Sequence, residues 1–346
     1  MSSLQRYSSF LSFWTLAVML LSGSSPGAKR PKTLQIYAID VEGGQATLIV
    51  SPSGQSLLVD TGWPGFNGRD AARIVAAGKA AGIQQIDYVV ITHYHRDHVG
   101  GTPQLADRMP IKVFMDHGPN QEDSEVTRED YAAYQKLLNT SNHVVLRPGD
   151  GVPLKDATVR VLTAAGERLP DPLPAAGTAN PYCSSEPETP VDNSENARSV
   201  GLLVTYGKFR FLDLGDLTKR KELEMACPNN MLGTIDLFLV SHHGSDQSNT
   251  KALVYALHPT AAIIDNGAHK GGSAAVWDIV HASPGLQDLW QLHYAVDAGP
   301  AHNSPEELIA NPEENCQGKY IRVTAQSNGT FTVLNSQNGF HKTYHK

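Results

Sequence analysis

A chain of 346 residues is long enough to bury a sizeable core, as one large domain or as two smaller ones. Hydrophobic residues make up 40% of it and charged residues 18%, which excludes an intrinsically disordered chain. The net charge of −7 makes long nucleic acid a less favoured partner than a small molecule, because phosphate backbones bind to basic surfaces.

The first 28 residues have the pattern of a secretory signal peptide. Arg6 precedes an apolar stretch over residues 10–21, and small residues follow as far as Ala28. The apolar stretch is shorter than the ~20 residues that a membrane-spanning helix needs. We therefore expect cleavage near Ala28, a secreted or periplasmic protein, and no membrane span once the signal has been removed.

Strands dominate the first half of the remaining chain. Two helices are predicted, one over residues 70–81 that ends at Gly82 and one over residues 126–138 with an apolar face. The predicted strands are apolar runs bounded by Gly and Pro turns, at residues 34–39, 46–50, 56–59, 88–92, 111–115, 143–146 and 157–163.

A proline-rich segment interrupts this pattern over residues 166–193. Such a composition cannot hold regular structure and predicts a long surface loop. The loop is either a linker between two domains or a lid beside a substrate cleft. We favour a loop inside one domain, because the segments beyond it resume the same chemistry.

The second half is again rich in strands. They are predicted at residues 200–206, 208–214, 235–240 and 261–264, and a hairpin at 320–325 and 330–334 turns at Asn328-Gly329. Two strand-rich halves with scattered helices suggest two sheets packed face to face with helices outside. Three cysteines, Cys183, Cys227 and Cys316, allow one disulfide and one free thiol, and the sequence does not indicate which pair closes.

The segment Thr92–Gly101 holds the densest set of metal ligands, directly after a predicted strand. His93 and His95 lie two residues apart, so in an extended chain both imidazoles can face one ion. Asp97 and His98 follow the turn and can face a second ion. The alternative is a solvated, His-rich loop without a function.

Two further segments supply ligands at predicted strand ends, namely Gly215-Asp216 and His242-His243. Imidazole with carboxylate suits zinc best, followed by manganese or iron. Asp216 is predicted to bridge two ions that share a hydroxide. Each ion would lower the pKa of bound water towards ~7, so a nucleophile would exist without a Ser or Cys.

These motifs together resemble the metallo-β-lactamase superfamily. The resemblance rests, in chain order, on Asp60-Thr61-Gly62, residues 93–98, Gly215-Asp216 and residues 242–245. The segment Ile39–Ala46, the Gly-Asp pair and Ser-His-His-Gly-Ser resemble its ComEC-like branch. That branch includes the extracellular domain of DNA-uptake channels and phosphorylcholine esterases.

The resemblance implies an α+β fold, an αββα four-layer sandwich, in one domain over residues 33–340. It implies two divalent metal ions, with His93 and His95 on the first, Asp97 and His98 on the second, and Asp216 between them. His242 is implied as the last ligand, and His243 would touch the substrate or donate a proton, although the reverse order stays open. Asp97 and His243 are thus the predicted catalytic residues, and Asp60 would orient a ligand histidine.

The sequence departs from the superfamily pattern at one position. Many members supply a further His between the His cluster and the Gly-Asp pair, but no His lies between His143 and His242. Glu195, Asn196 or water is expected to stand in, which disfavours β-lactamase or glyoxalase activity. Among the other histidines, His269 is an additional candidate because it follows a predicted strand end.

The sequence therefore predicts a secreted dinuclear metal-dependent hydrolase. A phosphodiester or related phosphorylated substrate is favoured, either a small molecule or a component of the cell envelope. One alternative keeps the metals and hydrolyses an ester, a lactone or a β-lactam. Another is a non-catalytic metal-binding module. No feature of the sequence indicates the oligomeric state.

Overall fold

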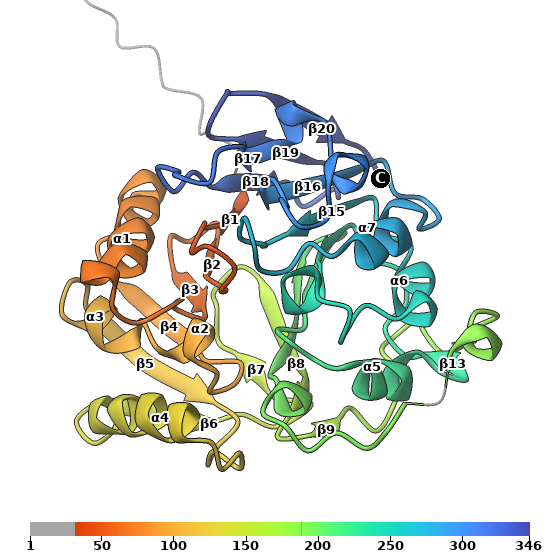
Figure 1. Cartoon of the computed structure of the whole chain (residues 1–346). Coiled ribbons are helices and arrows are strands. Elements are labelled where there is room, and N and C mark those ends of the chain that lie inside the picture. The colour runs from red at the N-terminus through yellow and green to blue at the C-terminus, as the bar shows by residue number, and fades with distance from the viewer. Residues whose placement is uncertain (1–31, 188) are drawn as a thin grey trace, which may run out of the picture. The chain divides into compact units, whose positions relative to one another are not determined.

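Two nine-stranded sheets form the centre of the computed structural model, which describes residues 32–187 and 189–346 (Figure 1). The predicted signal peptide, residues 1–28, lies outside the described residues. Within the described part, no helix combines the length and the hydrophobicity that a membrane crossing requires.

The first sheet combines the N-terminal strands with the end of the chain, in the order β20-β19-β18-β1-β2-β3-β4-β5-β6. Strands from β20 to β3 pair antiparallel, and those from β3 to β6 pair parallel. The bounds are β1 Leu34–Ala38, β2 Thr47–Val50, β3 Ser56–Val59, β4 Ile86–Val90, β5 Ile111–Asp116, β6 Asn142–Val145, β18 Ile321–Ala325, β19 Phe331–Asn335 and β20 His341–Tyr344.

The second sheet runs in the order β17-β16-β15-β14-β12-β11-β8-β7, and β9 pairs with β8. Its strands from β12 to β17 are parallel. The bounds are β7 Gly151–Val152, β8 Thr158–Ala164, β9 Glu167–Arg168, β11 Gly201–Tyr206, β12 Phe209–Asp213, β14 Leu237–Leu239, β15 Ala261–Ile264, β16 Asp288–His293 and β17 Ile309–Asn311.

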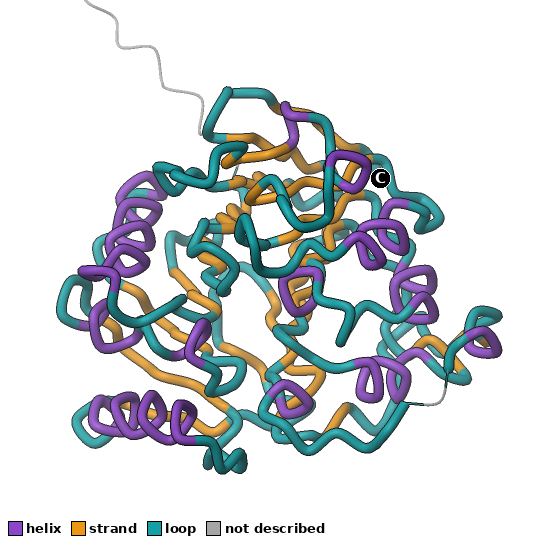
Figure 2. The backbone as a smooth tube through the Cα atoms, viewed as in Figure 1, coloured by secondary structure: helices purple, strands orange, loops and turns teal. Residues whose placement is uncertain are grey.

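Helices cover the outer face of each sheet, so that in Figure 2 the purple segments surround the orange ones. The first sheet is covered by α1 Arg69–Ala81, α2 Arg96–Val99, α3 Thr102–Ala106 and α4 Glu125–Leu138. The second is covered by α5 Lys219–Ala226, α6 Lys251–Leu257 and α7 Ala274–His281. Six 3-10 turns connect these elements, at Phe66–Gly68, Cys183–Ser185, Asn196–Arg198, Ser241–Gly244, Pro300–His302 and Glu306–Leu308.

Three hydrophobic cores separate the four layers. The central core packs the two sheets together and includes Ile36 of β1 and Phe211 of β12. The neighbouring residue Tyr37 faces the opposite side of β1 and joins the outer core under α1 and α4, as the alternation of side chains along a strand requires. A third core lies under α5, α6 and α7. The predicted α+β class and αββα sandwich are confirmed.

The proline-rich segment 166–193 contains more structure than we predicted. It includes β9, the short strand β10 at Thr178–Ala179 and the turn Cys183–Ser185. Strand β10 pairs with β13, Asn229–Asn230, and a disulfide joins Cys183 to Cys227. The expectation of a loop without regular structure was therefore wrong, because contacts distant in sequence, which local composition does not reveal, hold this segment in place.

Candidate metal centre

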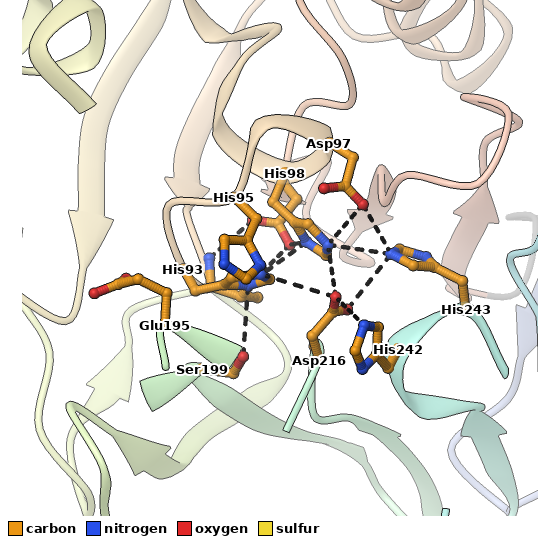
Figure 3. Close-up of polar contacts among 12 residues, drawn as sticks. His93, His95, Asp97, His98, Glu195, Ser199, Asp216, His242 and His243 are labelled. Carbon is orange, nitrogen blue, oxygen red and sulfur yellow. Dashed lines mark hydrogen bonds and ion pairs between the residues drawn. The ribbon is translucent and has the colours of Figure 1, made fainter. Parts of the chain in front are cut away.

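The polar residues at several strand ends meet at one edge of the two sheets (Figure 3). His93 to His98 follow β4, Asp216 follows β12, and His242 and His243 follow β14. Parallel strands present their carboxyl ends at the same edge of a sheet, which is where α/β proteins usually assemble a site. Packing the two sheets face to face then brings the two halves of the site together.

Four residues at this edge form a close cluster of ligand atoms. One atom each of Asp97, His98, Asp216 and His243 lies within 4.8 Å of all the others, and all four residues are buried. His98 Nε2 is 3.2 Å from Asp216 Oδ2, and His243 Nε2 is 3.2 Å from Asp97 Oδ2. Ligands bound to a tetrahedral zinc ion at about 2.0–2.1 Å lie roughly 3.3 Å apart. The cluster therefore has the spacing of a divalent metal site.

Within that cluster, His98 Nε2 and His243 Nε2 face each other at 3.1 Å. Two neutral imidazole nitrogens that both offer a lone pair would repel each other, so this arrangement requires a shared proton or a cation. Two aspartates border the pair, and their negative charges stabilise a positive charge between the two rings, whether it is a proton or a metal cation.

The second group of ligands lies on the other side of Asp216. His93 Nε2 is 3.8 Å from Asp216 Oδ2, and the ring centres of His93 and His95 are 4.7 Å apart. Both His93 Nε2 and Asp216 Oδ1 are buried, and neither has a hydrogen-bond partner among the described residues. Buried polar atoms are rarely left unpaired, so each of these two atoms is available to a metal ion, and Asp216 Oδ1 lies on the side of His243, 3.5 Å from its Nε2. The donor set thus fits divalent metal ions beside Asp216.

Two carboxylates each contact one ring nitrogen of a ligand histidine. His98 Nδ1 lies 2.7 Å from Asp60 Oδ2, and His95 Nε2 lies 3.1 Å from Glu122 Oε2. A carboxylate acceptor places the imidazole proton on the nitrogen that faces it and leaves the lone pair on the other nitrogen. His98 can therefore bind a metal through Nε2, and His95 through Nδ1.

The remaining histidines follow the same pattern. His93 Nδ1 lies 3.0 Å from Thr92 Oγ1, and His243 Nδ1 lies 3.4 Å from Asp265 Oδ2. Each of these rings therefore has a polar partner outside the cluster and its Nε2 inside. Glu122 and Asp265 were missed by the sequence analysis, although Asp265 follows β15 at the same sheet edge and could have been found from that position.

The electrostatics of the site match this ligand set. Burial lowers the pKa of His93 well below its ordinary value, which keeps the ring neutral and able to bind a metal. Burial alone would raise the pKa of Asp216, but the positive charges of His98, His243 and His242 outweigh it and hold that pKa well below its usual range. The carboxylate is therefore ionised.

The two consecutive histidines occupy different positions. His243 belongs to the four-residue cluster, and its side chain is 1% exposed. His242 Nε2 is 3.3 Å from Asp216 Oδ2, but its side chain is 12% exposed and its Nδ1 lies 3.3 Å from Ser248 Oγ. Both residues have a φ of 55°, a left-handed turn that directs two neighbouring side chains to the same site. Of the two orders left open by the sequence, this geometry favours His243 as the ligand.

Glu195, one of the residues expected to replace the missing histidine, does not reach the cluster. Glu195 is fully buried and points away from the cluster (Figure 3). Its carboxylate accepts hydrogen bonds from His117 Nε2 at 2.9 Å and from the backbone N–H of Gln121 at 2.9 Å. From the same segment, Ser199 Oγ comes within 3.5 Å of His93 Nδ1. His269 is 57% exposed and pairs with Asp297 instead.

Comparison with known proteins relates part of the chain to one family. Residues 39–186 match the family model of the Metallo-beta-lactamase superfamily. These residues correspond to a metallo-β-lactamase superfamily domain. Members of this superfamily are mostly hydrolases that bind divalent metals.

Two relatives agree with the ComEC-like branch. ComE operon protein 3 of Bacillus subtilis is 24% identical over 254 residues, which are 67% of this chain and 28% of that protein. Recombination protein 2 of Haemophilus influenzae is 27% identical over 237 residues, 68% of this chain and 24% of that protein. The chain thus spans about a quarter of the length of these relatives. Among solved structures, the metallo-β-lactamase fold protein YhfI of Bacillus subtilis aligns with a TM-score of 0.44 at 14% identity, covering 75% of this chain and 96% of that one.

Proposed function

We propose that this protein is an exported dinuclear metal-dependent hydrolase of phosphodiesters or related phosphorylated compounds. The observation that carries the proposal is the position of Asp216, whose Oδ2 lies 3.8 Å from His93 Nε2 and 3.2 Å from His98 Nε2, and whose Oδ1 lies 3.5 Å from His243 Nε2. One carboxylate between two groups of imidazoles is the arrangement that a pair of hydrolytic metal ions requires.

The residues of the site then have distinct roles. His93 and His95 would hold the first ion, Asp97, His98 and His243 would hold the second, and Asp216 would contact both. When bound, such a pair of ions, best matched by zinc, supplies an activated water and stabilises charge that develops at phosphorus.

His242 has a separate role in this proposal. Its partly exposed ring lies beside Asp216 and can reach a bound substrate. It would orient the substrate or give a proton to the leaving oxygen.

The substrate is proposed to be a small or cell-envelope phosphodiester rather than a long nucleic acid. The net charge of −7 supports this choice, since proteins that bind nucleic-acid polymers present dense basic surfaces. Export is supported by the pattern of the first 28 residues, and the disulfide between Cys183 and Cys227 suits an oxidising compartment.

The test combines metal content with turnover. We expect about two zinc ions per purified chain and hydrolysis of a chromogenic phosphodiester, with little activity towards a lactone or a cephalosporin. Asp216→Asn should lose both bound metal and turnover, whereas Asp297→Asn, at an exposed carboxylate, should lose neither. Metal-loaded protein that hydrolyses only the lactone or cephalosporin would favour the alternative activity. Protein without metal would indicate a non-catalytic module.

A further inference from the structure

We propose that Lys270 binds the anionic oxygen of the substrate at the edge of the metal centre and thereby selects for charged phosphorus esters. This inference rests on the proposed function and adds the residue that recognises the charge of the substrate. Lys270 lies in the loop between β15 and α7. Its ammonium contacts the carboxylate of Asp97, which is itself part of the four-residue cluster.

Two loops that pack closely together fix the position of Lys270. The backbone N–H of Gly267 donates to the carbonyl of Lys270 at 2.8 Å. A Cβ added to Gly43 would lie 2.8 Å from Lys270 Cβ, and one added to Gly267 would lie 2.7 Å from the carbonyl carbon of Glu42. These distances are too short for any residue larger than glycine, so the loop after β1 and the loop after β15 form one tightly packed unit. Lys270 is therefore a positioned residue rather than a freely moving surface lysine.

The Lys270 ammonium has one N–H donor left for a ligand. A lysine ammonium has three N–H donors. Lys270 Nζ donates to the carbonyl of Gly43 at 2.6 Å and to the carboxylate of Asp97, which accounts for two of them. Its side chain is 38% exposed, so a ligand can reach the third. The ring centre of Trp63 lies 4.9 Å from Nζ, and this cation–π contact stabilises the positive charge.

This arrangement favours one chemical class of substrate. A phosphodiester carries its negative charge on the non-bridging oxygens, whose bonds to phosphorus stay intact during hydrolysis. An ammonium can bind such an oxygen before and during the reaction. A neutral ester or lactone offers no such charge. A cation in direct contact with a carboxylate of the cluster therefore gives the site a preference for anionic substrates.

The experiment compares three variants of the metal-loaded, full-length mature protein. Lys270→Met removes the charge and keeps the aliphatic chain, and Lys270→Arg restores a charge at the same position. Lys112→Met is the matched control, because Lys112 also binds a carboxylate, Asp87, but on the surface and away from the cluster. The measurements are the dissociation constant of inorganic phosphate, bound metal per chain, and kcat and KM for a phosphodiester and for a neutral aryl ester.

We expect Lys270→Met to weaken phosphate binding and to raise KM for the diester by about 10- to 100-fold, which corresponds to the loss of one charged hydrogen bond. Bound metal per chain should stay the same, and any loss of activity on the neutral aryl ester should be much smaller than the loss on the diester. Lys270→Arg should recover most of the phosphate affinity, and Lys112→Met should behave like the original protein.

Two results would overturn the inference. One is unchanged phosphate affinity in Lys270→Met, and the other is a loss of bound metal in that variant, which would mean that Lys270 only supports Asp97. A failure of the proposed function would give a different result from these two. The original protein would then bind phosphate through Lys270 but hydrolyse no phosphodiester.

Discussion

His242 and His243 are adjacent in the chain, yet only His243 has its Nε2 among the ligand atoms of the buried cluster. The two side chains can therefore be distinguished by separate measurements. We expect His243→Ala to lower bound metal by about one ion per chain and to abolish turnover. His242→Ala should keep both ions and lose kcat by about 100- to 10,000-fold, the range for removal of a proton donor. Metal analysis and kinetics on both variants check this, and the opposite pattern would restore His242 as the ligand.

Asp60 controls which nitrogen of His98 is free to bind a metal. Asp60 Oδ1 accepts the backbone N–H of Thr92 at 2.8 Å, and Oδ2 faces His98 Nδ1 at 2.7 Å. In Asp60→Asn the amide can keep the bond from Thr92, and its NH₂ group then faces His98 Nδ1. The imidazole proton moves to Nε2, and the lone pair needed for the metal is lost.

The Asp60→Asn variant should therefore bind zinc about 10- to 100-fold more weakly than the original protein. Competition with a chelator measures this affinity, and circular dichroism verifies that the fold is retained. Equal zinc affinity in the two proteins would mean that Asp60 has only a structural role.

The sequence alone indicated the candidate metal ligands. It did not indicate the residues that contact those ligands and fix their positions. His93, His95, Asp97 and His98 lie in one short segment, so their spacing is visible without a structure. Glu122 and Lys270 reach the site only through loops whose path depends on tertiary packing. No local pattern distinguishes either of them from an ordinary charged surface residue.

At the level of elements, the sequence analysis found most strands and two long helices but missed α5, α6 and α7. These helices contain only seven or eight residues each, too few to produce a clear helical period. They are stable because their apolar faces cover the second sheet, as the buried residues Leu253 and Val280 illustrate. Strand β20 was missed for a similar reason, since its polar sequence forms a strand only by pairing with β19.

Glu222 connects two of these short helices. It lies in α5, and its carboxylate accepts the backbone N–H groups of Asn249 at 2.8 Å and Thr250 at 2.7 Å at the start of α6. Burial raises the pKa of Glu222 from 4.5 to about 7. The folded protein therefore binds more protons than the unfolded chain between about pH 4.5 and 7, and the free energy of unfolding falls as the pH rises through that window.

Replacing Glu222 by Gln should remove this dependence on pH. The shift from 4.5 to about 7 corresponds to at most about 3 kcal/mol lost from the original protein between pH 4.5 and 7. Denaturant unfolding of both proteins across that range measures the difference, since all other titrating groups are shared. Parallel curves for the two proteins would show that Glu222 is ionised in the folded state throughout.

Across the whole described part of the chain, the metal centre depends on how firmly the two sheets are held together, because its ligands come from both. Metal ligands follow β4 of the first sheet and β12 and β14 of the second. The periodicity of the sequence predicted both sheets and their apolar faces. It could not predict that β20 would join the first sheet and contact β16, which lies next to the edge of the second sheet.

Tyr344 of β20 makes that contact. Its side chain is buried in the central core and stacks on Phe331 of the same sheet. Its hydroxyl accepts a hydrogen bond from Trp290 Nε1 at 2.9 Å and donates to Asp288 Oδ2 at 2.6 Å, and both partners belong to β16 of the second sheet. The C-terminal strand therefore links the two sheets through one aromatic residue.

Two substitutions separate the polar and apolar parts of this link. Tyr344→Phe should lower the free energy of unfolding by about 1–3 kcal/mol, because the indole N–H of Trp290 would be buried without a partner. Tyr344→Ala should lower it by about 3–5 kcal/mol, because a cavity in the central core is added to that loss. Chemical denaturation measures both values, and Phe340→Ala, at a more exposed ring in the same region, serves as the control. If Tyr344→Ala cost no more than that control, the sheets would be held together by the remaining core alone, and the C-terminal strand would contribute little to the metal centre.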